Sequence, residues 1–254
     1  MGAKIALLLL SVGAFPAWSI DIPRVGFALD QFGHLHAING IAGNFILGDA
    51  LADDTALNFS WNGSFGIRKT DSTLEWWDAA GTRLAVIDAP PGCVLIGFSG
   101  QSALIYSRSA QSLSELRVNH WKLEQIPISL ADDERVLALT GTRDSVDVAI
   151  RRRDGVLIAT FDRNTGSRIA ERPLTRSGTH ALFRADGSLA GIDGSTVWVA
   201  RPDGSEWSAD NGSALTDLAW MGRDWIVLSA ADRQFALRTG VEPRIYTLPQ
   251  AVTE

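Results

Sequence analysis

Two histidines have a spacing that suits metal chemistry. His34 and His36 are separated by one residue, so in an extended strand both imidazoles point to the same face. Imidazole nitrogen is a frequent ligand of zinc and copper. Two ligands do not complete a site, however, and His120 and His180 are remote in the sequence, with no carboxylates or cysteines at metal-ligand spacing around them. The sequence therefore predicts neither a metal site nor a cofactor, and it leaves His34 and His36 as candidate ligands.

Tryptophan is unusually frequent, with nine in the chain. Most of these side chains are expected to fill the core between neighbouring sheets. Trp76 and Trp77 are adjacent, and adjacent residues of a strand face opposite sides, so one of the two is predicted to be exposed. An exposed indole offers a platform for a sugar ring or a partner protein. Trp76 and Trp77 are therefore the candidate residues for binding a ligand or a partner.

No group of residues in the sequence identifies a reaction. The chain has no Gly-x-Ser-x-Gly nucleophile motif, and the glycine-rich stretch from Gly40 to Gly48 lacks the lysine of a phosphate-binding loop. Glycoside hydrolysis needs two facing carboxyl groups, and the 29 acidic residues are spread over predicted turns, so no pair can be selected. No catalytic residue is predicted, which favours a non-enzymatic role without deciding the question.

The chain is acidic, with a formal net charge of -6 at pH 7 and 29 acidic against 23 basic residues. Binding to nucleic-acid phosphates requires a basic face, so no nucleic-acid partner is expected. Apolar residues make up 46% of the 254 positions, which is enough to bury a sizeable core. The composition thus predicts a folded domain.

Residues 1–19 have the features of a signal peptide. A lysine precedes an apolar run, Ile5 to Phe15, that is too short to span a bilayer, and Ala17 and Ser19 stand at the small-residue positions of a cleavage site. Cleavage there would leave a single domain of residues 20–254 with no stable membrane insertion. We therefore expect a periplasmic or extracellular protein. An uncleaved anchor is the alternative. The only cysteine, Cys93, cannot form an internal disulfide and is expected to be buried.

From Arg24 onward the chain alternates between short apolar segments and turn residues. The segments have five to eight residues rich in Val, Ile, Leu, Phe and Trp, and Gly, Asp, Asn and Pro separate them. This alternation is typical of strands and turns. No window of twelve or more residues has the apolar period of a helix with proper caps. The pattern predicts an all-β fold.

The turns recur at a nearly fixed interval. Members of one series are separated by 38, 38, 47, 38 and 36 residues: Gly43, Gly81, Asn119, Gly166, Gly204 and Gly240. A second series precedes each of them in step: Gly33, Ser72, Gln111, Asp154, Gly194 and Asp232. A period of about 40 residues that carries four strands suits a propeller blade, a small sheet that must stack on its neighbours.

We therefore predict a β-propeller of about six four-stranded blades. Five or seven blades are the alternatives, because the 47-residue interval hides an insertion or an odd strand. The first unit has only three clear strands, and either Ile20 to Pro23 or the tail around Val252 is expected to supply the missing edge. The predicted blades are Arg24 to Leu51, Ala56 to Ala89, Val94 to Leu130, Val136 to Arg176, His180 to Asp210 and Leu215 to Leu248.

Three stretches resemble known propeller repeats. Thr160 to Arg168, with its Asp-Arg-Asn-Thr-Gly turn, resembles the hairpin of quinoprotein-like and YVTN-type bacterial propellers, and Trp76-Trp77-Asp78 is similar to the Trp-Asp ending of WD40 strands. The stretch from Gly26 to Asp49 resembles uncharacterised exported propeller-like proteins of soil bacteria. These resemblances imply an exported propeller and bring no activity with them.

The complete repeat without a catalytic pattern favours a non-catalytic exported propeller that acts as a binding or protein-interaction scaffold. Its unknown protein or glycan partner would dock on one end of the ring or across the mouth of the central channel. The alternative is a small propeller enzyme that acts on carbohydrate, as a hydrolase or a lyase, a reading that the tryptophan content supports. A subunit of a larger surface assembly is a third hypothesis.

Overall fold

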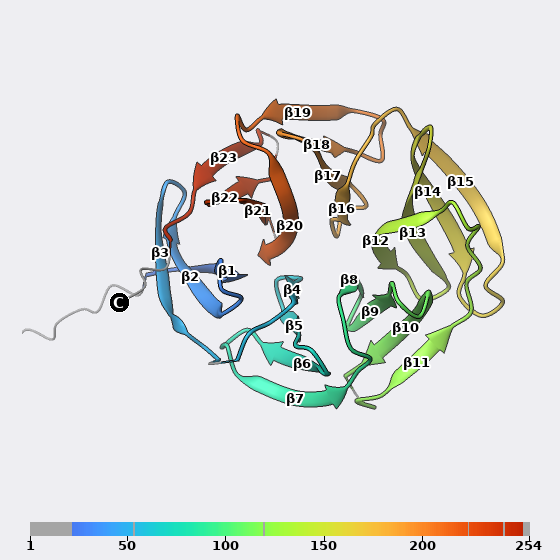
Figure 1. Cartoon of the computed structure of the whole chain (residues 1–254), viewed down its shortest axis with the longest axis horizontal. Helices are drawn as coiled ribbons and strands as arrows, with labels where there is room; N and C mark the ends of the chain where they lie inside the picture. The colour runs from blue at the N-terminus through green and yellow to red at the C-terminus, as the bar shows by residue number, and fades with distance from the viewer. Residues whose placement is uncertain (1–21, 53, 119, 223, 241, 251–254) are drawn as a thin grey trace, which may run out of the picture.

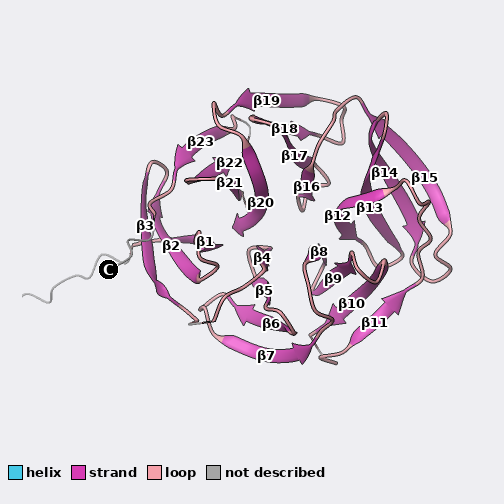
Figure 2. Cartoon of the chain, viewed as in Figure 1, coloured by secondary structure: helices cyan, strands magenta, loops and turns pink. Residues whose placement is uncertain are grey.

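The computed structural model describes residues 22–52, 54–118, 120–222, 224–240 and 242–250, and within these ranges it contains strands and no helix (Figure 2). The strands form small sheets arranged as a ring around a central axis (Figure 1). In chain order they are β1 (Arg24–Leu29), β2 (Leu35–Ile41), β3 (Asn44–Ala50), β4 (Asn58–Trp61), β5 (Phe65–Lys69), β6 (Thr73–Asp78), β7 (Arg83–Asp88), β8 (Val94–Ser99), β9 (Ser102–Ser107), β10 (Ser112–Arg117), β11 (Leu123–Ile126), β12 (Arg135–Gly141), β13 (Ser145–Arg152), β14 (Gly155–Asp162), β15 (Arg168–Leu174), β16 (His180–Phe183), β17 (Leu189–Asp193), β18 (Thr196–Ala200), β19 (Glu206–Asp210), β20 (Leu215–Gly222), β21 (Trp225–Ala230), β22 (Gln234–Arg238) and β23 (Arg244–Thr247).

Hydrogen bonding joins the strands into five sheets. One has three strands, β1 to β3, and three have four strands each, β4 to β7, β16 to β19 and β20 to β23. The fifth has eight strands in the order β11-β10-β9-β8-β12-β13-β14-β15. Its two halves meet at a single parallel pair, Phe98 of β8 opposite Thr140 of β12. All other pairs are antiparallel neighbours in sequence, so the chain builds the ring from successive meanders.

The predicted all-β class is confirmed, and each of the six predicted segments contains one run of consecutive antiparallel strands. The predicted turns lie between strands, where Gly43 and Gly81 have φ of +85° and +81°, the left-handed backbone that a tight hairpin needs. Asn119 lies outside the described residues. The 47-residue interval from Asn119 to Gly166 holds an insertion. Residues 127–134 form the connection from β11 to β12, and the two strands that follow β12 have eight residues each.

The first sheet closes against the last one. β20 lies next to both β1 and β4, and β1 approaches it so closely that a Cβ on Gly26 would lie 1.5 Å from the carbonyl oxygen of Met221. Glycine is required at this contact because any side chain would collide with backbone. The carbonyl of Pro23 accepts a hydrogen bond from the Gly40 N–H at 2.8 Å, so Pro23 extends the β1–β2 pair. Ile22 and Pro23 form no strand of their own, so this described part of the predicted edge segment adds no fourth strand to the sheet. The other residues expected to complete the first unit, Ile20, Asp21 and Val252, lie outside the described ranges, as does the predicted signal peptide.

The core lies between neighbouring sheets. One cluster joins Ile67 and Leu74 to Val94 and Leu116 of the next sheet, and equivalent clusters recur around the ring. Burying a large aliphatic side chain contributes about 1.5 to 3 kcal/mol, so each sheet is stabilised mainly by its two neighbours. Cys93 is exposed beside Gly92, and the expectation that it is buried is wrong, because the turn before β8 lies outside these clusters. No helix of the described ranges is long and apolar enough to cross a membrane.

Candidate functional site

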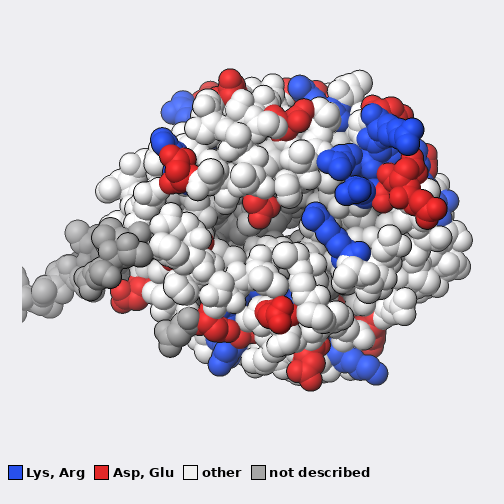
Figure 3. All heavy atoms as spheres, viewed as in Figure 1, with Lys and Arg blue, Asp and Glu red and all other residues white. Residues whose placement is uncertain are grey.

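A cavity of about 340 Å³ occupies the centre of the ring. Figure 3 shows the hollow from one end, with acidic and basic atoms on its border. The innermost strands β4, β8, β12, β16 and β20 line it, and none of its described lining residues belongs to β1, β2 or β3. The described residues of the three-stranded sheet therefore do not line the channel. The flanking strands β20 and β4 contact each other in front of this sheet and form the wall there.

The walls of the channel combine apolar side chains with polar groups, and several of the polar side chains lie toward the strand ends. At the end where the innermost strands begin, the lining includes Asn58, His180 and Asp217. At the opposite end it includes Asn62 and Arg184. A concave cavity lined by apolar surface and a few convergent polar groups is the usual form of a ligand site.

Asp217 is the acidic residue of this lining. Its side chain is open to the channel, yet the surrounding protein removes enough solvent to raise the pKa of the carboxyl group above its ordinary value. The Leu218 N–H, which donates to Oδ1 at 2.8 Å, and the charges of His180 and Arg108 act in the opposite direction and only partly offset the burial. A carboxyl group held in this state is typical of a functional position.

A groove of about 340 Å³ runs from the same mouth between the first and last sheets. Asp30, Thr216, Asp217, Ser229 and Arg233 are among its lining residues, so Asp217 belongs to both cavities. The groove and the channel therefore meet at Asp217.

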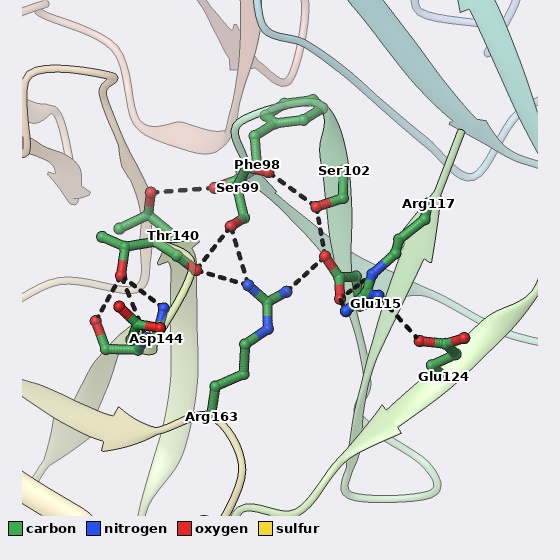
Figure 4. Close-up of polar contacts among 11 residues, drawn as sticks. Phe98, Ser99, Ser102, Glu115, Arg117, Glu124, Thr140, Asp144 and Arg163 are labelled. Carbon is green, nitrogen blue, oxygen red and sulfur yellow. Dashed lines mark hydrogen bonds and ion pairs between the residues drawn. The ribbon is translucent and has the colours of Figure 1, made fainter. Parts of the chain in front are cut away.

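Near the ends of β12 and β14, outside the channel lining, polar side chains are engaged with one another (Figure 4). Arg163 donates to the carbonyl of Thr142 at 2.6 Å and pairs with Glu115 at 2.6 Å. Glu115 also accepts from the Ser102 hydroxyl at 2.5 Å and from Arg117 Nε at 2.8 Å. Burial alone raises the pKa of Glu115, but Arg117, Ser102 and the charge of Arg163 hold it below its ordinary value. These groups join the two halves of the eight-stranded sheet.

Glu134 is the centre of a second network. It accepts from Arg152 Nε at 2.9 Å, from Arg168 Nη2 at 2.6 Å and from the Ala131 N–H at 3.0 Å. Burial alone raises the pKa of Glu134, and these donors overcome it and lower the pKa from 4.5 to about 2. Its carboxylate oxygens accept these hydrogen bonds from within the protein, as is typical of a carboxylate with a structural role.

The prediction that Trp76 or Trp77 is exposed is wrong, since the two side chains are only 2% and 4% exposed. Trp76 stacks on Phe65 with ring centroids 4.1 Å apart, and it faces the sheet that follows. Trp77 packs with Phe27 and Trp61 against the sheet that precedes. Adjacent residues do face opposite sides of β6, but in this ring a neighbouring sheet covers each side.

The structure brings the candidate ligands His34 and His36 together with a residue that the sequence analysis did not select. Asp30 Oδ2 lies 3.4 Å from His34 Nδ1 and 3.1 Å from His36 Nε2. His180 lies in the channel lining, and His120 in the turn after β10, lines a separate surface hollow.

Two carboxylates were missed, Asp30 and Asp217. Asp30 could have been found from its place at the start of the turn that leads to His34, because an Asp at a turn start folds its side chain back over the next residues. Asp217 has no such signal, because it becomes a channel residue only when β20 reaches the ring centre.

No protein-family profile and no curated protein sequence matches the chain. The chain is similar in fold to TolB from Acinetobacter baumannii, with a TM-score of 0.61 and 14% identity over 90% of this chain and 64% of that one. It is similarly related to a chain of a nidogen–laminin complex, with a TM-score of 0.59 and 11% identity over 90% of this chain and 99% of that one.

A third similar structure is PorZ, described as an essential bacterial surface component of the type-IX secretion system of Porphyromonas gingivalis. Its TM-score is 0.53, with 12% identity over 91% of this chain and 38% of that one. These neighbours have propeller-like folds, and at such low identities the likeness concerns the fold alone. The chain has a fold of the β-propeller type.

Proposed function

We propose that the protein is an exported, non-catalytic β-propeller of six blades, the first with three strands, and that it binds a partner at the mouth of its central channel. The partner inserts a cationic group, an amine or a guanidinium, next to Asp217. The observation that carries this proposal is the position of Asp217, where the central channel meets the groove between the first and last sheets.

The chemistry of the mouth supports a cationic partner. A carboxylate in a partly desolvated site gains more from an opposite charge than one on the open surface, because the local dielectric is lower. His180 and Arg108 already influence Asp217 through their charges, and its pKa is still raised. An arriving cation would favour the ionised form that burial disfavours.

The arrangement gives less support to a carbohydrate-active enzyme. Hydrolysis of a glycosidic bond by the common mechanisms uses two carboxyl groups on either side of the bond. Among the described residues of the channel lining, Asp217 is the one that carries a carboxyl group. The buried carboxylates elsewhere in the ring, Glu115 and Glu134, are saturated by arginines.

Export is part of the same proposal. It is motivated by the signal-peptide pattern of residues 1–19 and is consistent with a fold stabilised by packing between sheets. Mass spectrometry of the protein recovered from its native envelope or medium tests this point. A chain beginning at Ile20 supports export with cleavage, whereas a chain retaining residues 1–19 contradicts it.

The binding proposal is tested by titrating the mature protein with two peptides that are acetylated at the N-terminus and amidated at the C-terminus, Gly-Lys-Gly and its uncharged counterpart Gly-Gln-Gly, and following binding by NMR. The lysine peptide is expected to perturb residues of the channel mouth and to bind more tightly as the pH rises through the pKa of Asp217. Asp217→Asn should abolish the preference for lysine, while Asp154→Asn, in an exposed turn, should leave it unchanged. Equal binding of both peptides to all proteins would contradict the proposal.

A further inference from the structure

The turn between β1 and β2 holds a carboxylate and two imidazoles in a compact group. Asp30 Oδ1 accepts the backbone N–H groups of Phe32 and His34, both at 2.8 Å. These bonds fix the carboxyl group at the start of the turn. They leave the second oxygen, Oδ2, free to face other groups.

Both imidazoles approach that second oxygen. His36 Nε2 lies 3.1 Å from Asp30 Oδ2, and His34 Nδ1 lies 3.4 Å from the same atom. The Asp30 side chain is 5% exposed and that of His36 is 9% exposed, whereas His34, at 36%, is open to solvent. The three ligand atoms all lie within 4.8 Å of one another.

A backbone carbonyl sets the tautomer of His36. Its Nδ1 lies 2.8 Å from the carbonyl oxygen of Gly48, which can only accept, so Nδ1 carries the hydrogen. Nε2 then either carries a second proton or directs a lone pair at the carboxylate. A lone pair facing a carboxylate requires a cation between them. An Nδ1–H donated to a carbonyl is also the usual way in which a metal-binding histidine is oriented.

Asp30 supplies the negative charge of the group. The backbone N–H groups of Phe32 and His34 both donate to its carboxyl group, and such bonds favour the ionised form. The ionised carboxylate can act as a ligand.

We propose that Asp30, His34 and His36 form a binding site for a divalent transition-metal ion, with zinc the best fit. Two nitrogens and one oxygen are a donor set for zinc, whereas magnesium and calcium take oxygen ligands. Bonds of about 2.0 to 2.1 Å in a tetrahedron separate the ligand atoms by about 3.3 Å. The Asp30–His36 and Asp30–His34 separations of 3.1 Å and 3.4 Å match this value.

The site has an open side. His34 is the exposed ligand, so a small movement of its side chain closes the group around the ion. Asp30 also lines the groove between the first and last sheets, which gives the ion a path from solvent and a position for a water or an outside ligand. The metal site and the proposed contact at Asp217 use different side chains of the same groove, and neither proposal requires the other.

The test consists of two titrations of the untagged protein. Zinc binding is measured by calorimetry, and cobalt binding is measured by the visible absorption of the bound ion. One equivalent of zinc is expected to bind and to raise the melting temperature, and cobalt should show the strong bands of a tetrahedral site with nitrogen ligands. His36→Gln should weaken binding by more than about 100-fold, because even a change in a group that only orients a ligand costs 10- to 100-fold.

Two further variants keep the result interpretable. Asp30→Asn preserves the acceptor for Phe32 and His34, so the turn should persist while zinc binding falls. His120→Gln removes a histidine from a different sheet and should bind zinc like the wild type. The proposal is overturned if no zinc binds, which would make His36 a protonated partner of Asp30, or if zinc binding survives both His36→Gln and Asp30→Asn.

Discussion

Glu134 and Asp217 belong to the same ring of sheets and have opposite surroundings. Glu134 lies in the connection before β12 and accepts hydrogen bonds from two arginines and a backbone N–H, which lower its pKa to about 2. Asp217 lies at the channel mouth, where burial raises its pKa and one backbone N–H donates to it. The comparison separates carboxylates that hold the fold together from one that we propose contacts a partner.

Removing the charge of Glu134 should have the largest effect. Glu134→Gln leaves Arg152 and Arg168 without their shared anion and is expected to cost about 2 to 3 kcal/mol of unfolding free energy. Denaturant unfolding measures this loss. The matched variant is Glu171→Gln, an exposed acid paired with the same arginines, whose loss should stay below about 1 kcal/mol. Equal losses for the two variants would remove the distinction between the buried and the exposed pair.

The pH dependence of stability should follow Glu134. Its pKa is 4.5 when unperturbed and about 2 in the folded chain, so the folded state binds fewer protons than the unfolded state between these values. The stabilisation is present above pH 4.5 and should be lost as the pH falls from 4.5 toward 2. The difference in unfolding free energy between the wild type and Glu134→Gln, measured across this pH window, isolates the contribution of the Glu134 carboxylate. A flat difference would contradict it.

Asp217→Asn should have the smallest effect on the unfolding free energy, and it should stabilise the protein where Glu134→Gln destabilises it. The folded-state pKa of Asp217 is raised, so its contribution to stability decreases as the pH rises from 3.8 through the folded value. At neutral pH the neutral amide should be more stable than the wild type, by less than about 1 kcal/mol because channel solvent screens the charge. The melting temperatures of the wild type and Asp217→Asn, measured at neutral pH and at low pH, test this expectation. A clear destabilisation would place Asp217 among the structural carboxylates.

Local patterns in the sequence predict the fold well. Turn residues such as Gly43 and Gly81 mark hairpins because their backbone requires a positive φ, and strands between them follow from alternating apolar residues. The exposure of one of Trp76 and Trp77 was predicted wrongly, because the solvent side of a strand depends on whether another sheet covers it. The place of Asp217 in the channel lining could not be predicted, because it depends on closure of the ring.

The candidate metal site was predictable in part. The spacing of His34 and His36 is visible in the sequence, whereas the contribution of Asp30 depends on how the turn folds its carboxyl group back toward β2. The hydrogen bond from His36 to Gly48 joins β2 to β3 and depends on strand register.

Site-specific photo-crosslinking in the native cell tests the central claim most directly. A photoreactive amino acid is placed at Thr216, exposed at the channel mouth, and in a second protein at Leu84, which is 53% exposed on the outer strand β7. The account predicts a discrete crosslinked partner from position 216 that disappears when Asp217→Asn is added, and no such partner from position 84. Partners captured only from position 84, or from position 216 regardless of Asp217, would contradict it.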